Sequence, residues 1–383
     1  MSKNHQTVLF SEFDASPEDV KPCQTVQQIR EANSLLQRSS QTVQAEQDVG
    51  ASCADEIFED QHRVFTISSG AKPIGRDGET KERIAEILKK LMGSGNFRPV
   101  RVPDETIDQQ LKTLAQDFPN FSHVVESIVA VHAKLLRRGV RHRMPHILLN
   151  GGPGVGKSRF ASALAQVLDS PLLKIDLAVE TNGSALTGSS TFWANSSVGG
   201  LFSMLAFGTG GKDSVANPVV FVDEVDKAGR DLTHDPLAPL YALLEPVSAA
   251  QFVDQGLPGV TMDTSLVRWL LTSNSTSSIP EPILSRLTVF NILAPTKDQA
   301  RRIAQKVATD YVFDYALNVD PRLSASMLDD CSKLTPRQIR KRIELALGIA
   351  VVADATVLTD AAWAASAVAD GSELRAGRRI GFY

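Results

Sequence analysis

Residues 151–158 read Gly-Gly-Pro-Gly-Val-Gly-Lys-Ser. This stretch matches the phosphate-binding pattern G-x-x-x-x-G-K-[ST] at every required position. Glycine permits the tight backbone path that turns N–H groups toward an anion, lysine adds a point charge, and the serine hydroxyl suits Mg²⁺. The sequence therefore predicts a nucleotide-binding loop, and its members are Gly152, Pro153, Gly154, Val155, Gly156, Lys157, Ser158 and Arg159.

The flanking sequence supplies the strand and the helix that such a loop requires. Residues 146–150 form a short apolar run typical of a buried strand, and residues 157–168 repeat apolar side chains at helical spacing. A glycine-rich turn that matched the pattern by chance would not be expected to have a buried strand before it and a helix after it. Strand, loop and helix together predict a parallel sheet with helices on both faces.

A second apolar run, residues 218–222, leads into Asp223 and Glu224. Carboxylates at the C-terminal end of a buried parallel strand face the ligand crevice. We expect Asp223 to hold Mg²⁺ together with Ser158, and Glu224 to polarise the attacking water. A solvent-facing acidic strand end is the alternative reading.

Two later segments extend the pattern: a buried run over residues 266–274 and a turn-helix segment over residues 280–287. With them the chain resembles the AAA+ ATPases, which bind ATP and Mg²⁺. The resemblance implies that Asn274 is a sensor that places the water and that Arg286 is a finger reaching a neighbouring subunit's site. On residues alone, Asn274 could be a turn residue and Arg286 a surface charge.

The resemblance also implies a small helical lid after the core. Residues 297–314 and 335–352 have amphipathic spacing, and Thr335-Pro336 is a strong helix start. Arg337 lies at the head of the second helix, where AAA+ proteins place an arginine that contacts the outer phosphate. A solvated basic face is the alternative. Lys157, Glu224, Asn274, Arg286 and Arg337 form the expected catalytic set.

Within AAA+, the chain is most similar to the ATPase module of Lon proteases, over roughly residues 145–350. The similarity rests on the phosphate loop, Asp223-Glu224-Val225-Asp226-Lys227, His234-Asp235-Pro236-Leu237-Ala238 with Leu243-Leu244-Glu245-Pro246, Phe252-Val253-Asp254, and Ser273-Asn274-Ser275 with Ile279-Pro280. Lon enzymes continue into a peptidase domain, whereas this sequence ends at Tyr383. We therefore expect no proteolysis by this chain alone, which leaves room for a separate peptidase or adaptor partner.

A polar stretch from Thr181 to Gly200 contains Phe192 and Trp193 but no lysine or arginine. AAA+ protein translocases place an aromatic–hydrophobic pair in this position, facing a central pore. Two large aromatics are costly to expose, so they should either bind something or dock on the core. The resemblance favours a pore loop that grips polypeptide.

The composition of the chain limits which partners, location and degree of order we expect. The chain has 383 residues, 43% of them hydrophobic, and a net charge of −4, which gives no general attraction to nucleic acid. Three scattered cysteines, no signal peptide and no apolar run of about 18 residues predict a cytoplasmic protein without a membrane span. Residues 1–70 hold eleven acidic and five basic side chains, and with few apolar clusters they indicate disorder or loose helix.

The expected organisation has five parts. We predict an acidic N-terminal region (1–75), a helical lead-in (76–144), an AAA+ nucleotide-binding core of the P-loop NTPase class (145–295), a helical lid (296–372) and a basic tail (373–383). The expected function is an ATP-hydrolysing homo-oligomeric ring, a hexamer by resemblance to the family, that remodels protein clients. The rivals are a nucleic-acid motor or loader, which should carry basic pore loops, and a nucleotide switch or scaffold, which should lack a catalytic group.

Overall fold

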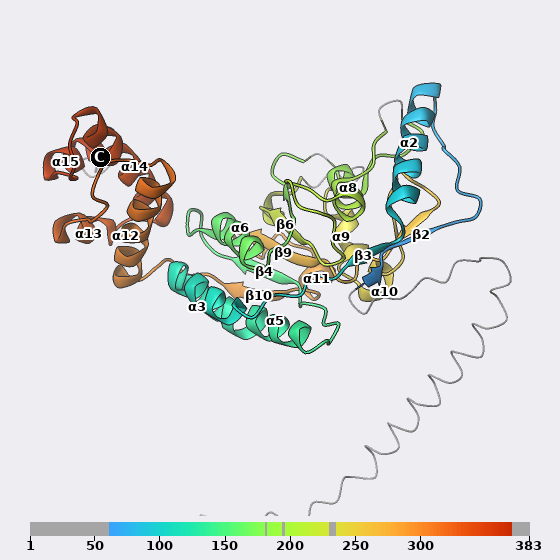
Figure 1. Ribbon diagram of the computed structural model, residues 1–383, viewed down its shortest axis with the longest axis horizontal. Coiled ribbons are helices and arrows are strands. Elements are labelled where there is room, and N and C mark those ends of the chain that lie inside the picture. Colours follow the sequence, from blue (N-terminus) through green and yellow to red (C-terminus); the bar gives the residue numbers. More distant parts are fainter. Residues whose placement is uncertain (1–60, 181, 194–195, 230–234, 370–383) are drawn as a thin grey trace, which may run out of the picture. The chain divides into compact units, whose positions relative to one another are not determined.

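The computed structural model describes residues 61–180, 182–193, 196–229 and 235–369 (Figure 1). Its centre is a five-stranded sheet of order β10-β4-β9-β6-β5, in which every neighbouring pair is parallel. The strands are β4 (Ile147–Asn150), β5 (Leu172–Asp176), β6 (Val219–Asp223), β9 (Arg268–Ser273) and β10 (Thr288–Asn291). The predicted P-loop NTPase sheet is thus confirmed.

Both faces of this sheet are covered, which explains why its strands are apolar without alternation. Ile147 and Leu149 of β4 point into one hydrophobic cluster, and Leu148 between them points into the other. On the first side, Phe160 and Leu164 pack against the sheet, and Phe121 stacks on Phe160 with ring centroids 4.5 Å apart. The helices of this side are α3 (Ile107–Asp117), η1 (Pro119–Phe121), α4 (Ser122–Val124), the π-helical turn η2 (Val125–Val129), α5 (Ala130–Arg137) and α6 (Lys157–Val167).

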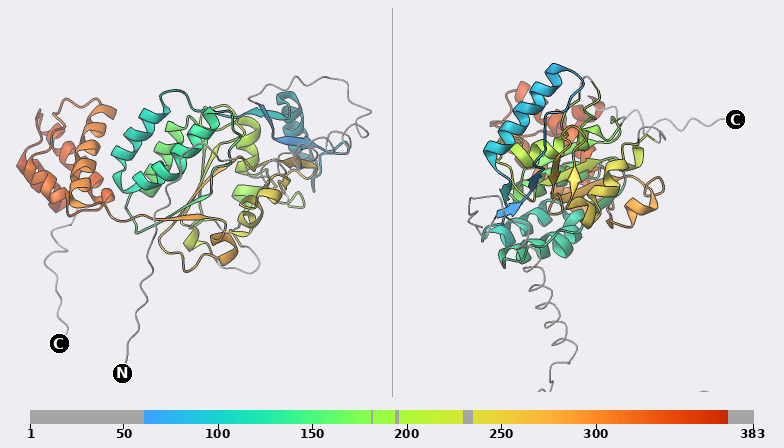
Figure 2. Two further views of the ribbon diagram at one scale, coloured as in Figure 1. Left: turned by 90° about the horizontal axis from the view of Figure 1, so that it is seen from below. Right: turned by 90° about the vertical axis from the view of Figure 1, so that its right-hand side faces the viewer.

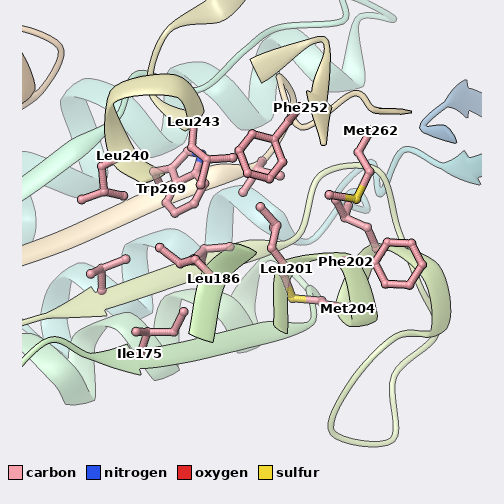
Figure 3. Packing of buried hydrophobic residues seen from close by; sticks show 14 of the residues in the cluster. Ile175, Leu186, Leu201, Phe202, Met204, Leu240, Leu243, Phe252, Met262 and Trp269 are labelled. Carbon is pink, nitrogen blue, oxygen red and sulfur yellow. The ribbon is translucent and has the colours of Figure 1, made fainter. Parts of the chain in front are cut away.

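The second cluster centres on Trp269 of β9, which is fully buried (Figure 3). Leu240, Leu243 and Phe252 lie around its indole, and Leu201 belongs to the same packed layer. The helices of this side are α2 (Gly78–Ser94), α7 (Ser184–Thr187), α8 (Gly200–Phe207), η3 (Val225–Lys227), α9 (Ala238–Leu243) and α11 (Glu281–Leu284). Residues far apart in sequence thus share one core beneath the loops that follow β5 and β6.

Two small antiparallel sheets were not predicted from the sequence. One pairs β1 with β3, and the other has the order β2-β8-β7. Their strands are β1 (Gln61–Arg63), β2 (Phe65–Ile67), β3 (Phe97–Pro99), β7 (Phe252–Val253) and β8 (Val260–Met262), and α10 (Pro246–Ala249) precedes β7. Phe65 is fully buried and lies edge-on to Phe202, so residues 61–67 belong to the core although we grouped them with the N-terminal region.

The lid consists of helices packed around their own hydrophobic cluster (orange to red in Figure 2). Its helices are α12 (Lys297–Asp314), α13 (Ala325–Cys331), α14 (Pro336–Val352) and α15 (Asp360–Ala369). Thr335 caps α14 in a capping box with Gln338, with Pro336 at the first helical position. The helices predicted over 297–314 and 335–352 are therefore confirmed.

Several predictions fall outside the described residues: most of the acidic N-terminal region, the basic tail, Cys23, Cys53 and His234. Cys331 is a buried free thiol in the lid core, and burial raises its pKa to about 12. Across the described part of the chain, none of the helices combines the length and apolar character needed to cross a bilayer.

Candidate functional site

The phosphate loop connects β4 to α6 with the backbone geometry its glycines were expected to provide. Gly154 and Gly156 have φ values of +78° and +106°, a region that side-chain-bearing residues rarely adopt. At Gly151 a Cβ would lie 2.4 Å from the carbonyl oxygen of Ile292, so only glycine fits there. Gly156 is the N-cap of α6, whose first residue is Lys157, so the positive helix end opens onto the loop.

Lys157 turns back across the loop. Its Nζ donates to the carbonyl oxygens of Gly151 and Gly152 and, at 3.0 Å, to Oδ1 of Asn274 at the end of β9. Burial lowers the pKa of Lys157, and the nearby carboxylates, led by Asp223, partly oppose that effect. The predicted sensor Asn274 therefore lies within hydrogen-bonding distance of the loop lysine.

Ser158 and Asp223 meet at the C-terminal edge of the sheet. Ser158 Oγ donates to Asp223 Oδ2 at 2.8 Å, so two oxygen ligands of the kind Mg²⁺ prefers are adjacent. Thr272 Oγ1 donates to the other carboxylate oxygen of Asp223. We did not predict a role for Thr272, although it lies two residues before Asn274 and so shares its face of β9.

Glu224 follows directly after β6 in a left-handed conformation, with φ of +55°, which is uncommon for a residue with a side chain. Its backbone N–H donates to Thr272 Oγ1 at 3.1 Å, which helps to hold this turn. Its carboxylate accepts a hydrogen bond from Lys227 Nζ at 2.7 Å. Glu224 is thus paired with Lys227, a lysine whose side chain is half exposed.

These groups line one cavity of about 640 Å³ between the core and the lid, a size typical of small-ligand sites. Its polar end is built from the phosphate loop, Asp223, Glu224 and Asn274. Its other walls come from Phe118, Asn120, Ala163, Gln166, Ile303 and Val307. A polar end formed by the phosphate loop and a partly apolar remainder of the cavity fit a nucleotide with its base on the apolar side.

The lid contributes charged side chains to this cavity. Arg337 lines it, and the Arg337 backbone N–H donates to the carbonyl oxygen of Gly154 at 3.2 Å. Two ion pairs join lid and core beside the cavity: Arg159 Nη2 to Asp310 Oδ2 at 3.2 Å and Lys306 Nζ to Asp117 Oδ2 at 3.6 Å. Arg159, which we assigned to nucleotide binding, therefore has a lid partner that the sequence did not reveal.

Arg286 does not belong to this cavity. It lies after α11, where its Nε contacts Glu245 Oε2 at 3.4 Å and its Nη1 donates to the carbonyl oxygen of Pro282. It lines a separate hollow of about 290 Å³ with Arg143, His146 and Ser265 among its walls. Four of the predicted catalytic residues line the same cavity, and Arg286 does not; the four are Lys157, Glu224, Asn274 and Arg337.

Phe192 and Trp193 are 81% and 66% exposed, so neither side chain docks on the core. They occupy a turn in which Trp193 N–H donates to the carbonyl oxygen of Ser190 at 3.0 Å. This turn lies between α7 and α8 and presents two aromatic side chains to solvent.

Comparisons with known proteins agree with this geometry. Residues 147–294 match the family described as "ATPase family associated with various cellular activities (AAA)". This segment is an AAA ATPase domain.

Over 225 residues the chain is 30% identical to the peroxisomal Lon protease homolog 2 of Zea mays, an alignment that covers 59% of this chain and 24% of that protein. It is 33% identical over 164 residues to the corresponding Oryza sativa subsp. japonica protein, covering 43% of this chain and 18% of the relative. It is 25% identical over 368 residues to a mitochondrial Lon protease homolog of Ostreococcus lucimarinus, covering 81% and 38%. The AAA region thus resembles that of Lon proteases, of whose length the chain spans well under half.

Among solved structures, the chain is similar to a mutant form of Thermotoga maritima RuvB, with a TM-score of 0.46 and 14% identity over 66% of this chain and 70% of that one.

Proposed function

We propose that this chain is an ATP-hydrolysing AAA+ motor that works as a ring and acts on polypeptide clients. The observation that carries the proposal is the presence, in one chain, of a phosphate-binding cavity and an exposed aromatic turn at Phe192 and Trp193. The core would span residues 145–295 and the lid residues 296–372.

The residues that line the cavity would each have a separate role in ATP hydrolysis. Backbone N–H groups of the loop and the amine of Lys157 would bind the phosphates, and Asn274 would place the water that Glu224 polarises. Ser158 and Asp223 would hold Mg²⁺, which supplies charge neutralisation between the phosphates. For Glu224 to reach the water, its contact with Lys227 must loosen, and a pair with both side chains this exposed can break at little cost.

The position of Arg286 supports a ring. It is the one predicted catalytic residue outside the cavity of its own chain. A head-to-tail interface, in which the Arg286 face of one subunit meets the cavity of the next, would supply the missing cation and would close into a ring. We propose six subunits, as the AAA+ resemblance implies.

Three observations favour polypeptide over nucleic acid. The stretch from Thr181 to Gly200 has no lysine or arginine to meet phosphates. Its two exposed aromatics offer the apolar contact that an extended polypeptide can use regardless of sequence. The named relatives in the AAA region are proteases, which also work on polypeptide. The proposal assigns no peptide-bond cleavage to this chain, because the assigned residues serve phosphate chemistry and polypeptide contact.

Steady-state ATP turnover tests the proposal, measured with and without a permanently unfolded polypeptide such as reduced, alkylated lactalbumin. We expect the polypeptide to stimulate turnover, and the double change Phe192→Ala, Trp193→Ala to abolish stimulation while leaving basal turnover. Single- and double-stranded DNA form the second arm. Stimulation by DNA and not by polypeptide would replace the proposal with a nucleic-acid motor, and nucleotide binding without turnover would favour a switch.

A further inference from the structure

Asp254, in the turn that joins β7 to β8, is a carboxylate that the nucleotide chemistry does not use. It is 1% exposed. Its Oδ2 accepts a hydrogen bond from the Gly199 N–H and its Oδ1 from the Gly256 N–H, both at 2.8 Å. The sequence singled it out only as part of Phe252-Val253-Asp254, without a role.

The Gly199 contact places Asp254 at the base of the aromatic turn. Gly199 is the N-cap of α8, which has no side-chain cap of its own, so the Asp254 carboxylate caps this helix from outside. Gly188 ends α7 on the other flank, and a Cβ there would lie 2.3 Å from Asp254 Oδ1. Asp254 therefore touches both flanks of the segment that carries Phe192 and Trp193.

Other contacts close the same base. The Gln255 N–H donates to the carbonyl oxygen of Thr187 at 2.8 Å, and the Ser189 N–H donates to that of Ser197 at 2.9 Å. At Gly256 a Cβ would lie 2.4 Å from the Ser197 carbonyl oxygen. Backbones this close leave little freedom at the base, while the aromatic side chains beyond it are exposed.

We infer that Asp254 is a positioning residue, which fixes the base of the Phe192–Trp193 turn to the β7–β8 turn so that the two aromatics can transmit force to a polypeptide. The inference rests on the proposed function for its client but on contacts alone for the positioning. A turn that pulls on a bound polypeptide must be fixed to the rest of the domain. If its base were mobile, the turn would move without displacing the polypeptide.

The protonation state of Asp254 should make its contacts with the aromatic turn depend on pH. Burial raises the pKa of Asp254 to about 7, and the hydrogen bonds from Gly199 and Gly256 oppose the shift. No charged side chain of the described residues enters that balance. Above pH 7 both carboxylate oxygens accept N–H donors, whereas protonation leaves one oxygen a poorer acceptor. The anchor should weaken as the pH falls through about 7.

The test compares Asp254→Asn with Asp263→Asn in the full chain. Asp263 follows β8, is partly buried and pairs with His62 Nε2 at 2.9 Å, so it receives the same chemical change away from the aromatic turn. Hydrogen exchange by mass spectrometry should show peptides containing Ser189 and Gly199 exchanging at least about tenfold faster in Asp254→Asn only, because the segment opens more often once the carboxylate no longer holds it.

Turnover supplies the second readout. Asp254→Asn should keep basal turnover within about twofold and weaken polypeptide stimulation, with a lower maximum and a higher polypeptide concentration needed for half of it. In the native protein the stimulated-to-basal ratio should fall as the pH drops through about 7; Asp254→Asn should remove this step and Asp263→Asn retain it.

Unchanged exchange in Asp254→Asn would overturn the inference, as would retained stimulation despite faster exchange. If polypeptide fails to stimulate even the native protein, the proposed client is wrong, and the exchange comparison alone then decides whether Asp254 positions the turn.

Discussion

The ion pairs between lid and core should slow the release of bound nucleotide, because they hold the lid against the core. Asp310 of α12 accepts from Arg159 of α6 at 3.2 Å, with side chains 27% and 43% exposed. It also pairs with Lys306 of its own helix at 2.8 Å. Replacing Asp310 with asparagine removes the charge that ties α12 to the phosphate-loop helix, while Lys306 keeps its contact with Asp117.

The expected change in the release rate follows from how exposed the Arg159 and Asp310 side chains are to solvent. Ion pairs this open to solvent stabilise by roughly 0.2–1 kcal/mol. If that stabilisation is lost when the lid opens to release nucleotide, Asp310→Asn should speed release roughly 1.5- to 5-fold. Because salt screens exposed charges, the difference from the native protein should shrink between about 0.1 M and about 1 M ionic strength.

Stopped-flow displacement of a fluorescent ATP analogue measures this rate. Asp329→Asn is the matched control, since Asp329 pairs with Arg301 and Lys333 inside the lid and touches no core residue through these pairs. Arg159→Gln should reproduce the effect of Asp310→Asn, and the double variant should add little to either. Equal release rates in Asp310→Asn and the native protein at low salt, or an equal effect of Asp329→Asn, would show that the Arg159–Asp310 pair does not hold the lid closed.

Two further predictions concern turnover and stability. Glu224→Gln should bind ATP normally but lower turnover by roughly 100-fold or more, because the amide cannot polarise water; equilibrium binding and phosphate release measure the two, and unchanged turnover would remove Glu224 from the chemistry. Thr335→Ala removes the N-cap of α14 and should lower lid stability by about 1 kcal/mol in urea unfolding, whereas Thr335→Ser should restore most of it; an equal loss in both would assign the effect to something other than the cap.

The sequence predicted the sheet and the phosphate site because their signals are local. Apolar runs that end in Asp223 or Asn274 mark strand and ligand edge together, and Gly154, Gly156 and Lys157 follow from the shape a phosphate requires. Thr335-Pro336 likewise indicated the start of α14. Each of these features is encoded within about ten residues, which is the range over which periodicity and capping act.

The features that escaped prediction depend on distant partners. The strands β1 and β2 have three residues each, too short for a period-two pattern, and β2 pairs with β8 almost two hundred residues later. The sequence around Arg159 did not indicate its ion pair with Asp310. Nor did the sequence around Asp254 indicate its hydrogen bond with the Gly199 N–H. Such pairings arise only when the core and lid have folded, so no local pattern records them.

In the proposed ring, Arg286 of one subunit completes the ATP site of its neighbour, and this arrangement can be tested by mixing two inactive variants. Arg286→Ala and Lys157→Ala subunits should each turn over ATP poorly alone. If they mix at random in a ring, about one site in four joins an intact Lys157 to a neighbour's intact Arg286, and turnover should recover to roughly that fraction. No recovery at any ratio, with mixed rings demonstrated by native mass spectrometry, would contradict the account.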